Sequence, residues 1–175
     1  MTTVFDQFRA QAAQGGMVPV TRQVVLDGDT AVSAFTKLHR GRFGFMLESL
    51  EGGERWARYT FLATDPRAVY RYTGTTCEQW TAGGWIPAGE GVKPLDHLGA
   101  ILRRHAPVKV PGLPRFTGGA VGFLGYDIVR TLEQLPQVPP DDRGLPDALM
   151  MVVDTLLVLD NLYNRATVIA TVEVP

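Results

Sequence analysis

The run Phe45-Met46-Leu47-Glu48-Ser49 is apolar for three residues and then stops at a carboxylate and a hydroxyl. The charged, glycine-rich stretch 51–55 follows at once. This order predicts a buried strand over Phe43–Ser49 whose end presents an acid and a small hydrogen-bonding group. Two interpretations fit that strand end. The polar side chains face water, or they line a ligand pocket in which Ser49 supplies a hydroxyl and Glu48 a charge for an ammonium group or an arginine.

Most of the other predicted strands lie next to one another in the sequence, as in meanders and hairpins. A strand over Ala57–Ala63 follows the first across a short loop, and a strand over Met17–Leu26 precedes both. The remaining predicted strands are Ala68–Thr73, Cys77–Thr81, Trp85–Ile86, Gly118–Leu124, Leu149–Asp160 and Ala166–Val174. A turn at Leu162-Tyr163-Asn164 makes the last two strands a hairpin.

Helical periodicity predicts four helices, over Thr3–Gln14, Thr30–Arg40, Pro94–His105 and Tyr126–Leu135. Thr30 is the expected N-cap of the second helix. The proline-rich stretch Pro107–Pro114 excludes a regular helix or a central strand there. Because meanders and hairpins outnumber βαβ units, the sequence predicts an α+β fold with mainly antiparallel sheet, in one domain spanning residues 1–175.

The composition is that of an ordinary globular chain. Of 175 residues, 45% are hydrophobic and 20% are charged, and the formal net charge is −1. Without a long block of like charge, a nucleic-acid or anionic-membrane surface is not predicted. No apolar run approaches the ~20 residues that span a bilayer, and no signal peptide is evident. The single cysteine, Cys77, excludes an intramolecular disulfide and fits a reducing compartment, so we expect a cytoplasmic protein.

Several sequence patterns that could indicate a binding or catalytic site do not match the motifs of such sites. The glycines of Gly118–Gly125 form neither Gly-x-Gly-x-x-Gly nor a phosphate loop, so we interpret them as a strand that approaches another element closely. The three histidines, His39, His97 and His105, form no His-x-His or His-Glu-x-x-His pair. We therefore predict no metal site and no histidine-based catalytic site in these 175 residues. Cys77 has no histidine close in sequence and is interpreted as structural.

Two carboxylates interrupt the apolar strands near the end of the chain, Asp154 and Asp160. A carboxylate inside a buried strand needs a partner. At a strand edge it faces water instead, and the sequence leaves both arrangements open.

Three segments, taken in order, resemble the family of anthranilate synthase component I. Phe45–Ser49, followed by Arg58–Leu62 and Asp65-Pro66, resembles the family motifs LLES and GRYSFIG with a later proline. Gly118–Asp127, followed by Arg130, Glu133 and Leu135-Pro136, resembles the family segment GGAVGYLGYD, and Val18–Arg22 resembles the opening strand. The departures are Thr60 for serine, Ala57 for glycine and Leu62-Ala63 for Ile-Gly.

The resemblance implies that the chain is the N-terminal regulatory domain of such an enzyme, without its chorismate-binding catalytic domain. The family's enzyme is a lyase that converts chorismate and ammonia to anthranilate and pyruvate, the first step of tryptophan biosynthesis. It uses Mg²⁺ and takes ammonia from a glutamine amidotransferase subunit. The segment alone is expected to be inactive and to need no cofactor.

In this family, tryptophan inhibits the enzyme by binding between strands of this domain and part of its own C-terminal domain. By position, Glu48, Ser49 and Leu50 are the expected inhibitor-site residues, and Pro19 is an expected packing contact. The family fold implies antiparallel sheets packed nearly orthogonally, with helices outside. An apolar sheet face left exposed would make this chain associate into a homo-oligomer as its concentration rises.

Three alternatives stay open. Aminodeoxychorismate synthase component I, on a folate route, shares the fold that the resemblance implies, but its corresponding segment more often reads Leu-Asp-Ser, so Glu48 favours anthranilate synthase. The chain could instead be a purely structural half-domain that binds nothing, or an unrelated small-molecule binding module.

Overall fold

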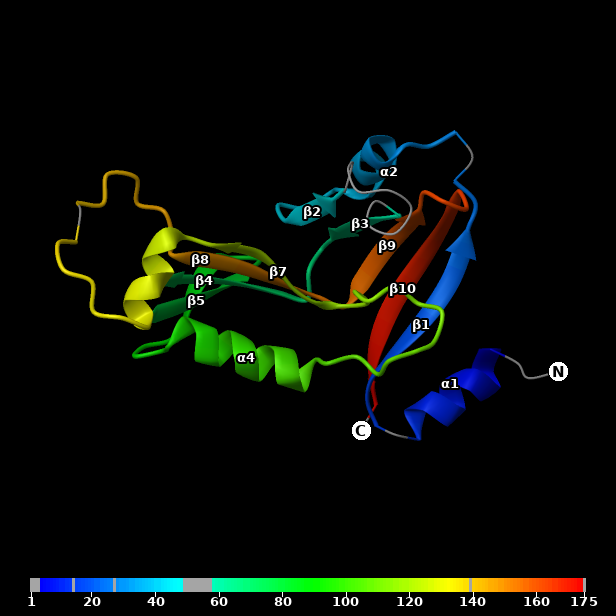
Figure 1. Ribbon diagram of the computed structural model, residues 1–175, viewed down its shortest axis with the longest axis horizontal. Coiled ribbons are helices and arrows are strands. Elements are labelled where there is room, and N and C mark those ends of the chain that lie inside the picture. The colour runs from blue at the N-terminus through cyan, green and yellow to red at the C-terminus, as the bar shows by residue number, and fades with distance from the viewer. Residues whose placement is uncertain (1–3, 14, 27, 49–57, 139, 175) are drawn as a thin grey trace. The chain divides into compact units, whose positions relative to one another are not determined.

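The computed structural model describes residues 4–13, 15–26, 28–48, 58–138 and 140–174. The chain divides into two compact units, each built around one five-stranded sheet (Figure 1). Unit 1 consists of Met1–Arg67, Arg104–Gly119 and Val153–Pro175. Unit 2 consists of Ala68–Arg103 and Ala120–Val152.

The sheet of unit 1 has the strand order β1-β10-β9-β3-β2. Its strands are β1 (Gly16–Val24), β2 (Gly44–Leu47), β3 (Tyr59–Thr64), β9 (Thr155–Asp160) and β10 (Arg165–Val174). Every neighbouring pair is antiparallel. β1 pairs with β10 over its whole length, and its place at the sheet edge accommodates Pro19, which has no N–H to donate.

The described residues of unit 1 form the helices α1 (Val4–Ala12) and α2 (Ala31–Leu38). The predicted N-cap of α2 is confirmed. The Thr30 hydroxyl accepts from the Ser33 N–H at 3.1 Å, and the Ser33 hydroxyl accepts from the Thr30 N–H at 3.0 Å. α2 covers one face of the sheet (Figure 1), where buried Ala34 packs with Leu62 and Leu157.

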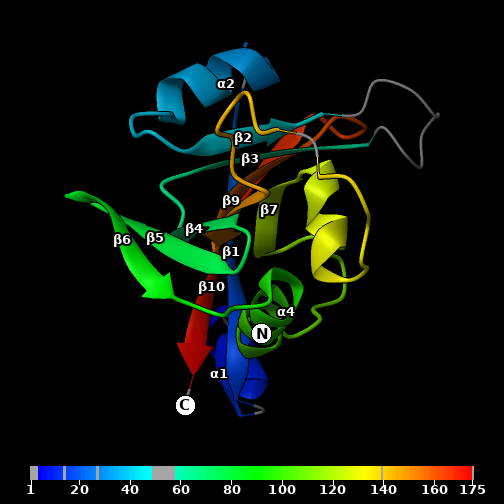
Figure 2. The ribbon, with the colours of Figure 1, turned by 90° about the vertical axis from the view of Figure 1, so that its left-hand side faces the viewer.

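The sheet of unit 2 has the strand order β6-β5-β4-β8-β7. Its strands are β4 (Ala68–Thr73), β5 (Thr76–Thr81), β6 (Gly84–Gly89), β7 (Gly119–Leu124) and β8 (Ala148–Val153). Helix α4 (Pro94–Arg104) lies along this sheet in Figure 1 and is seen nearly end-on in Figure 2, and its buried Leu98 packs with Tyr72, Cys77 and Ala148. The predicted antiparallel α+β class and the β4-β5-β6 meander are confirmed, whereas the orthogonal packing of the two sheets stays a prediction.

The prediction of one long strand over Leu149–Asp160 is wrong. The segment forms two strands, β8 and β9, which belong to different sheets and meet at Asp154. The Asp154 carbonyl oxygen accepts from the Thr171 N–H at 2.7 Å and from the Thr171 hydroxyl at 3.1 Å. Apolar residues on both sides hide this break, because each half is buried in its own core. The predicted β9–β10 hairpin is confirmed.

The helix predicted over Tyr126–Leu135 is present, but it is shorter and of the 3₁₀ type, η1 (Tyr126–Thr131). Its N-cap, Gly125, makes no side-chain hydrogen bond, so an α-helical first turn has no cap. The β-branched pair Ile128-Val129 lowers the α-helical preference further. Within the described ranges, no helix is long and apolar enough to cross a membrane.

Candidate functional site

The predicted inhibitor site begins at the end of β2. Glu48 directly follows this strand and is exposed, as is the last strand residue, Leu47. β2 lies at an edge of the sheet and pairs with β3, where Leu47 is opposite Phe61. Ser49 and Leu50, the other two predicted site residues, lie outside the described residues. The described part of the site is therefore an exposed carboxylate at a strand end.

Arg58, in the second family motif, lies just before β3 and is paired with Asp160 at the end of β9. Its Nη2 donates to Asp160 Oδ2 at 2.6 Å, and its Nε donates to Asp160 Oδ1 at 3.0 Å. The guanidinium carbon lies 4.8 Å from the ring centre of Tyr59 and 4.9 Å from that of Tyr163. The hydrogen bonds from Arg58 lower the pKa of the Asp160 carboxyl below its ordinary value. Asp160 thus has the partner that a carboxylate in an apolar strand needs.

The turn after β9 strengthens this junction. Asp160 Oδ1 also accepts from the Leu162 N–H at 3.2 Å. The Asn161 N–H donates to the Arg58 carbonyl at 2.8 Å, and the Asn161 side-chain amide donates to the Thr60 hydroxyl at 3.2 Å. The start of β3 is therefore fixed to the β9–β10 turn by both backbone and side chains.

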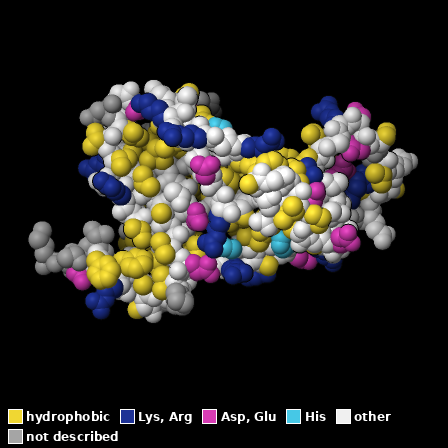
Figure 3. Space-filling view, turned by 180° about the vertical axis from the view of Figure 1, so that it is seen from behind, with side chains coloured by type: hydrophobic (Ala, Val, Ile, Leu, Met, Phe, Trp, Pro, Cys, Tyr) yellow, Lys and Arg dark blue, Asp and Glu magenta, His cyan; other side chains and the backbone are white. Residues whose placement is uncertain are grey.

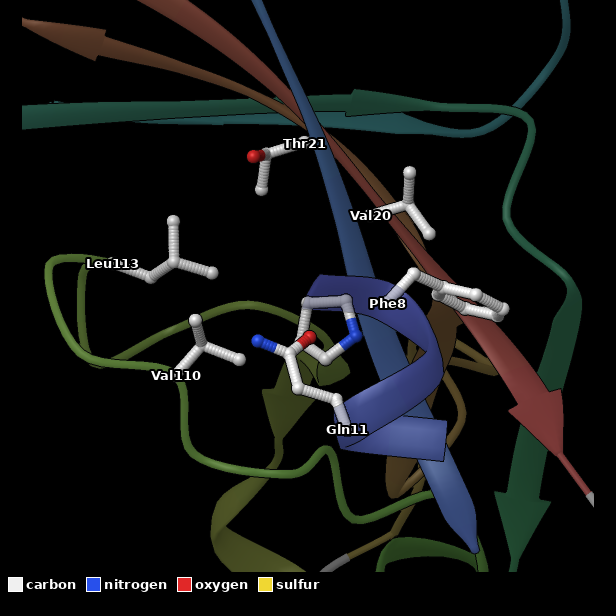
Figure 4. Close-up of a pocket in the computed structure, with 7 residues that line it drawn as sticks. Phe8, Gln11, Val20, Thr21, Val110 and Leu113 are labelled. Atoms are coloured by element: carbon white, nitrogen blue, oxygen red, sulfur yellow. The ribbon is translucent and has the colours of Figure 1, made fainter. Parts of the chain in front are cut away.

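Pro19 lies in a different part of unit 1. It is buried and lines a small cavity of about 80 Å³. The other lining residues are Phe8, Gln11, Val20, Thr21, Val110 and Leu113 (Figure 4). Small-molecule sites usually measure ~300–1,000 Å³, so this cavity is a packing gap between α1, β1 and the Pro107–Pro114 stretch. β1 and β2 form opposite edges of the sheet, four strand spacings or ~19 Å apart, so the structure does not bring Pro19 to Glu48.

Unit 2 contains a larger hollow of about 990 Å³, which the sequence did not predict. η1 and the stretch after it line the hollow, and Tyr126, Val138 and Leu145 are 83%, 73% and 63% exposed. Two of its carboxylates are engaged within the chain: Asp127 accepts from Arg130 at 2.6 Å, and Asp147 accepts from the Gly74 N–H at 2.6 Å. Its size is that of a ligand site, but these side chains do not form a catalytic group.

Cys77 has a histidine neighbour that its sequence surroundings did not indicate. His97, on α4, places Nδ1 3.8 Å from the Cys77 sulfur and 2.8 Å from the Tyr72 hydroxyl. Cys77 is 0% exposed, and burial raises the pKa of its thiol. A buried thiol with a raised pKa is a poor nucleophile, so the structural interpretation now rests on burial.

The described residues include no group of three or more His, Cys, Asp or Glu side chains that could hold a metal ion. The Mg²⁺ implied by the family resemblance therefore has no ligand set in the described part of the chain.

Comparisons with known proteins agree with the sequence motifs. The chain is 37% identical over 170 residues to anthranilate synthase component 1 of Acetivibrio thermocellus, covering 97% of this chain and 34% of that protein. It is 39% identical over 171 residues to anthranilate synthase component 1 of Mycolicibacterium smegmatis, covering 97% and 32%. No protein-family model matches the chain.

A solved structure shows the same fold. The crystal structure of anthranilate synthase component I from Streptococcus pneumoniae TIGR4 matches with a TM-score of 0.50 and 28% sequence identity, covering 87% of this chain and 31% of that one. The chain thus spans about a third of the length of the relatives that it matches. Over that third, in sequence and in fold, it belongs to the anthranilate synthase component I family.

Proposed function

We propose that this chain is the tryptophan-binding, regulatory part of an anthranilate synthase component I. The observation that carries the proposal is the match over 97% of the chain to proteins named anthranilate synthase component 1. The complete enzyme would convert chorismate and ammonia to anthranilate and pyruvate, with a glutamine amidotransferase subunit supplying the ammonia. Catalysis and Mg²⁺ binding would reside in the rest of the enzyme, and this segment would contribute regulation.

The geometry at the end of β2 supports a binding role for the motif. Glu48 is exposed at a strand end, where a carboxylate can reach a ligand ammonium group. Ser49 and nearby backbone groups would hold the amino-acid head, and apolar side chains would hold the indole. These groups suit a ligand that combines a zwitterionic amino-acid head with an apolar ring. Feedback inhibition then requires tryptophan to bind the inactive arrangement more tightly than the active one.

Calorimetric titration with L-tryptophan tests the proposal, on this chain and on the complete enzyme. We expect saturable binding to the complete enzyme, and loss of both binding and inhibition in Ser49→Phe, whose larger side chain fills the pocket. Uninhibited activity should be unchanged in that variant. Normal tryptophan sensitivity of Ser49→Phe would refute the assignment of Ser49.

Glu48→Gln tests the charge separately, with Glu90→Gln as a matched control. Glu90 is also an exposed glutamate that directly follows a strand, but it lies in unit 2. We expect Glu48→Gln to weaken tryptophan binding about tenfold, as for loss of a charge-assisted hydrogen bond, and Glu90→Gln to leave it unchanged. Absence of tryptophan binding by the complete wild-type enzyme would leave a purely structural role for the chain.

A further inference from the structure

Arg58 joins two parts of unit 1 that are distant in sequence, through hydrogen bonds from its Nε and Nη2 to Asp160. The fork of the guanidinium binds one carboxylate, Asp160, and the guanidinium carbon also lies 4.8 Å from the ring centre of Tyr59 and 4.9 Å from that of Tyr163. A planar guanidinium makes both kinds of contact at once, and an ammonium group does not. The arrangement therefore holds Arg58 in one position.

β3 passes this constraint on to β2. β2 has four residues and lies at the sheet edge, in register with β3 from Gly44 opposite Thr64 to Leu47 opposite Phe61. Thr60 directly precedes Phe61, which is the partner of Leu47, and it pairs with Leu159 of β9 on the other side. Thr60 is 0% exposed and is held by Asn161, in the turn that Asp160 organises. β3 thus connects the junction at Arg58 to β2, whose last residue, Leu47, directly precedes Glu48.

Such a junction matters for binding because affinity depends on how little a site must reorganise when its ligand arrives. A short edge strand has few contacts of its own and frays easily. The Arg58–Asp160 junction fixes the start of β3, which is the partner of β2. It therefore reduces the fraying of β2 without contacting the ligand.

We propose that Arg58, together with Asp160, is a positioning residue for tryptophan binding at the Glu48 end of β2. The proposal rests on the proposed function, since it names a residue that acts on the same site. The role assigned to Arg58 is exerted through β3, because its guanidinium is paired with Asp160.

The chain offers a matched control in unit 2. Arg71 donates from Nη2 to Glu78 Oε1 at 3.0 Å, and its guanidinium carbon lies 4.4 Å from the ring centre of Trp85. Arg71→Gln therefore removes a forked ion pair and an aromatic stack of the same kind, but away from β2.

The test combines two measurements on Arg58→Gln, Arg58→Lys and Arg71→Gln. The first is calorimetric titration of each variant with L-tryptophan. The second is hydrogen exchange of the β2 amides, Gly44–Leu47, which reports on the strand whether or not a ligand binds. Should Arg58→Gln fail to fold, Asp160→Asn removes the charge partner at nearly constant side-chain shape.

We expect Arg58→Gln to weaken tryptophan binding about tenfold, within the range of known coupling energies, and to speed exchange of the β2 amides by a similar factor. Arg58→Lys should restore part of the affinity, because it keeps the charge but loses the fork. Arg71→Gln should change neither quantity.

Unchanged tryptophan affinity in Arg58→Gln would overturn the proposal, and so would equal weakening by Arg58→Gln and Arg71→Gln, which is the result of a general loss of stability. A different outcome is that the wild type binds no tryptophan and that, of the variants, only Arg58→Gln speeds hydrogen exchange of the β2 amides. The proposed function is then wrong, and so is the role of Arg58 in tryptophan binding. If instead Arg58 has no influence on β2, the wild type binds tryptophan and Arg58→Gln leaves hydrogen exchange of the β2 amides unchanged.

Discussion

Gly122 in β7 lies so close to Leu149 in β8 that a Cβ atom at position 122 would overlap the Leu149 carbonyl oxygen. The two strands are neighbours in the sheet of unit 2. The interpretation of the glycine-rich run as a site of close backbone approach is thereby confirmed. A dinucleotide or phosphate site is not needed to explain these glycines.

Gly122→Ala should destabilise unit 2, because the new methyl group meets backbone atoms that cannot move independently. We expect a loss of ~1–3 kcal/mol in the free energy of unfolding, as for overpacking elsewhere. Urea denaturation of the variant and the wild type measures this loss. Gly83→Ala is the control, since a Cβ atom there meets only the Thr81 hydroxyl at 3.9 Å. Equal stability of the two variants would show that β7 and β8 can separate without cost.

Acid should weaken unit 1 through Asp160. Because Arg58 lowers the pKa of this carboxyl in the folded state, its contribution is complete above the pKa of the unfolded chain. The contribution is lost as the pH falls through the lower, folded value, so the loss begins below about pH 5 and continues below about pH 4. Urea midpoints measured from pH 6 to pH 3 should fall less steeply for Asp160→Asn than for the wild type. A parallel fall in both proteins would assign the acid sensitivity to other carboxylates.

The Cys77 thiol should react with alkylating reagents only when unit 2 opens. It is 0% exposed, and burial raises its pKa, so both access and thiolate content are low. We expect iodoacetamide labelling at pH 8 to be ~100-fold slower than in urea, which corresponds to a local opening free energy of ~2.7 kcal/mol. Mass spectrometry of timed samples measures it. Labelling at the denatured rate would mean that α4 does not protect the β4–β5 surface.

The isolated 175-residue chain should associate as its concentration rises. Val20 and Val172 are 37% and 44% exposed and lie on one face of the β1–β10 pair, and hydrophobic side chains gather on the surface near the N-terminus (Figure 3). Exposed apolar sheet faces favour association. Sedimentation velocity should show a rising apparent mass that Val20→Thr reduces. Val25→Thr, at an exposed position outside the strands, is the control. A monomer at the highest concentration would contradict the expectation.

Features that depend on neighbouring residues could be predicted from the sequence. The N-cap at Thr30 is one, because the hydroxyl and the N–H that it binds are three residues apart. The β4-β5-β6 meander is another, since glycine turns separate short β-branched and aromatic runs. The end of the strand before Glu48 could also be predicted, because an apolar run and the polar residues that end it are adjacent in the sequence.

Features decided by distant residues could not be predicted. The break at Asp154 depends on hydrogen bonds from Thr171, and both sides of it are equally apolar. The pairing of Arg58 with Asp160 joins positions 102 residues apart. Strand order also depends on distant residues, and it places Pro19, on β1, at the opposite edge of the sheet from β2.

The strand order of unit 1 has a consequence for how the chain folds during synthesis. β10 lies between β1 and β9, and Gly16 is paired with Val174. β1 therefore emerges from the ribosome well before β10, and its partner exists only once synthesis has reached Val174. Contacts of such long sequence separation form slowly, and an unpaired strand edge is open to wrong partners while it waits. Unit 2 can complete its sheet as soon as β8 has emerged, so it should be the first part of the nascent chain to resist proteases.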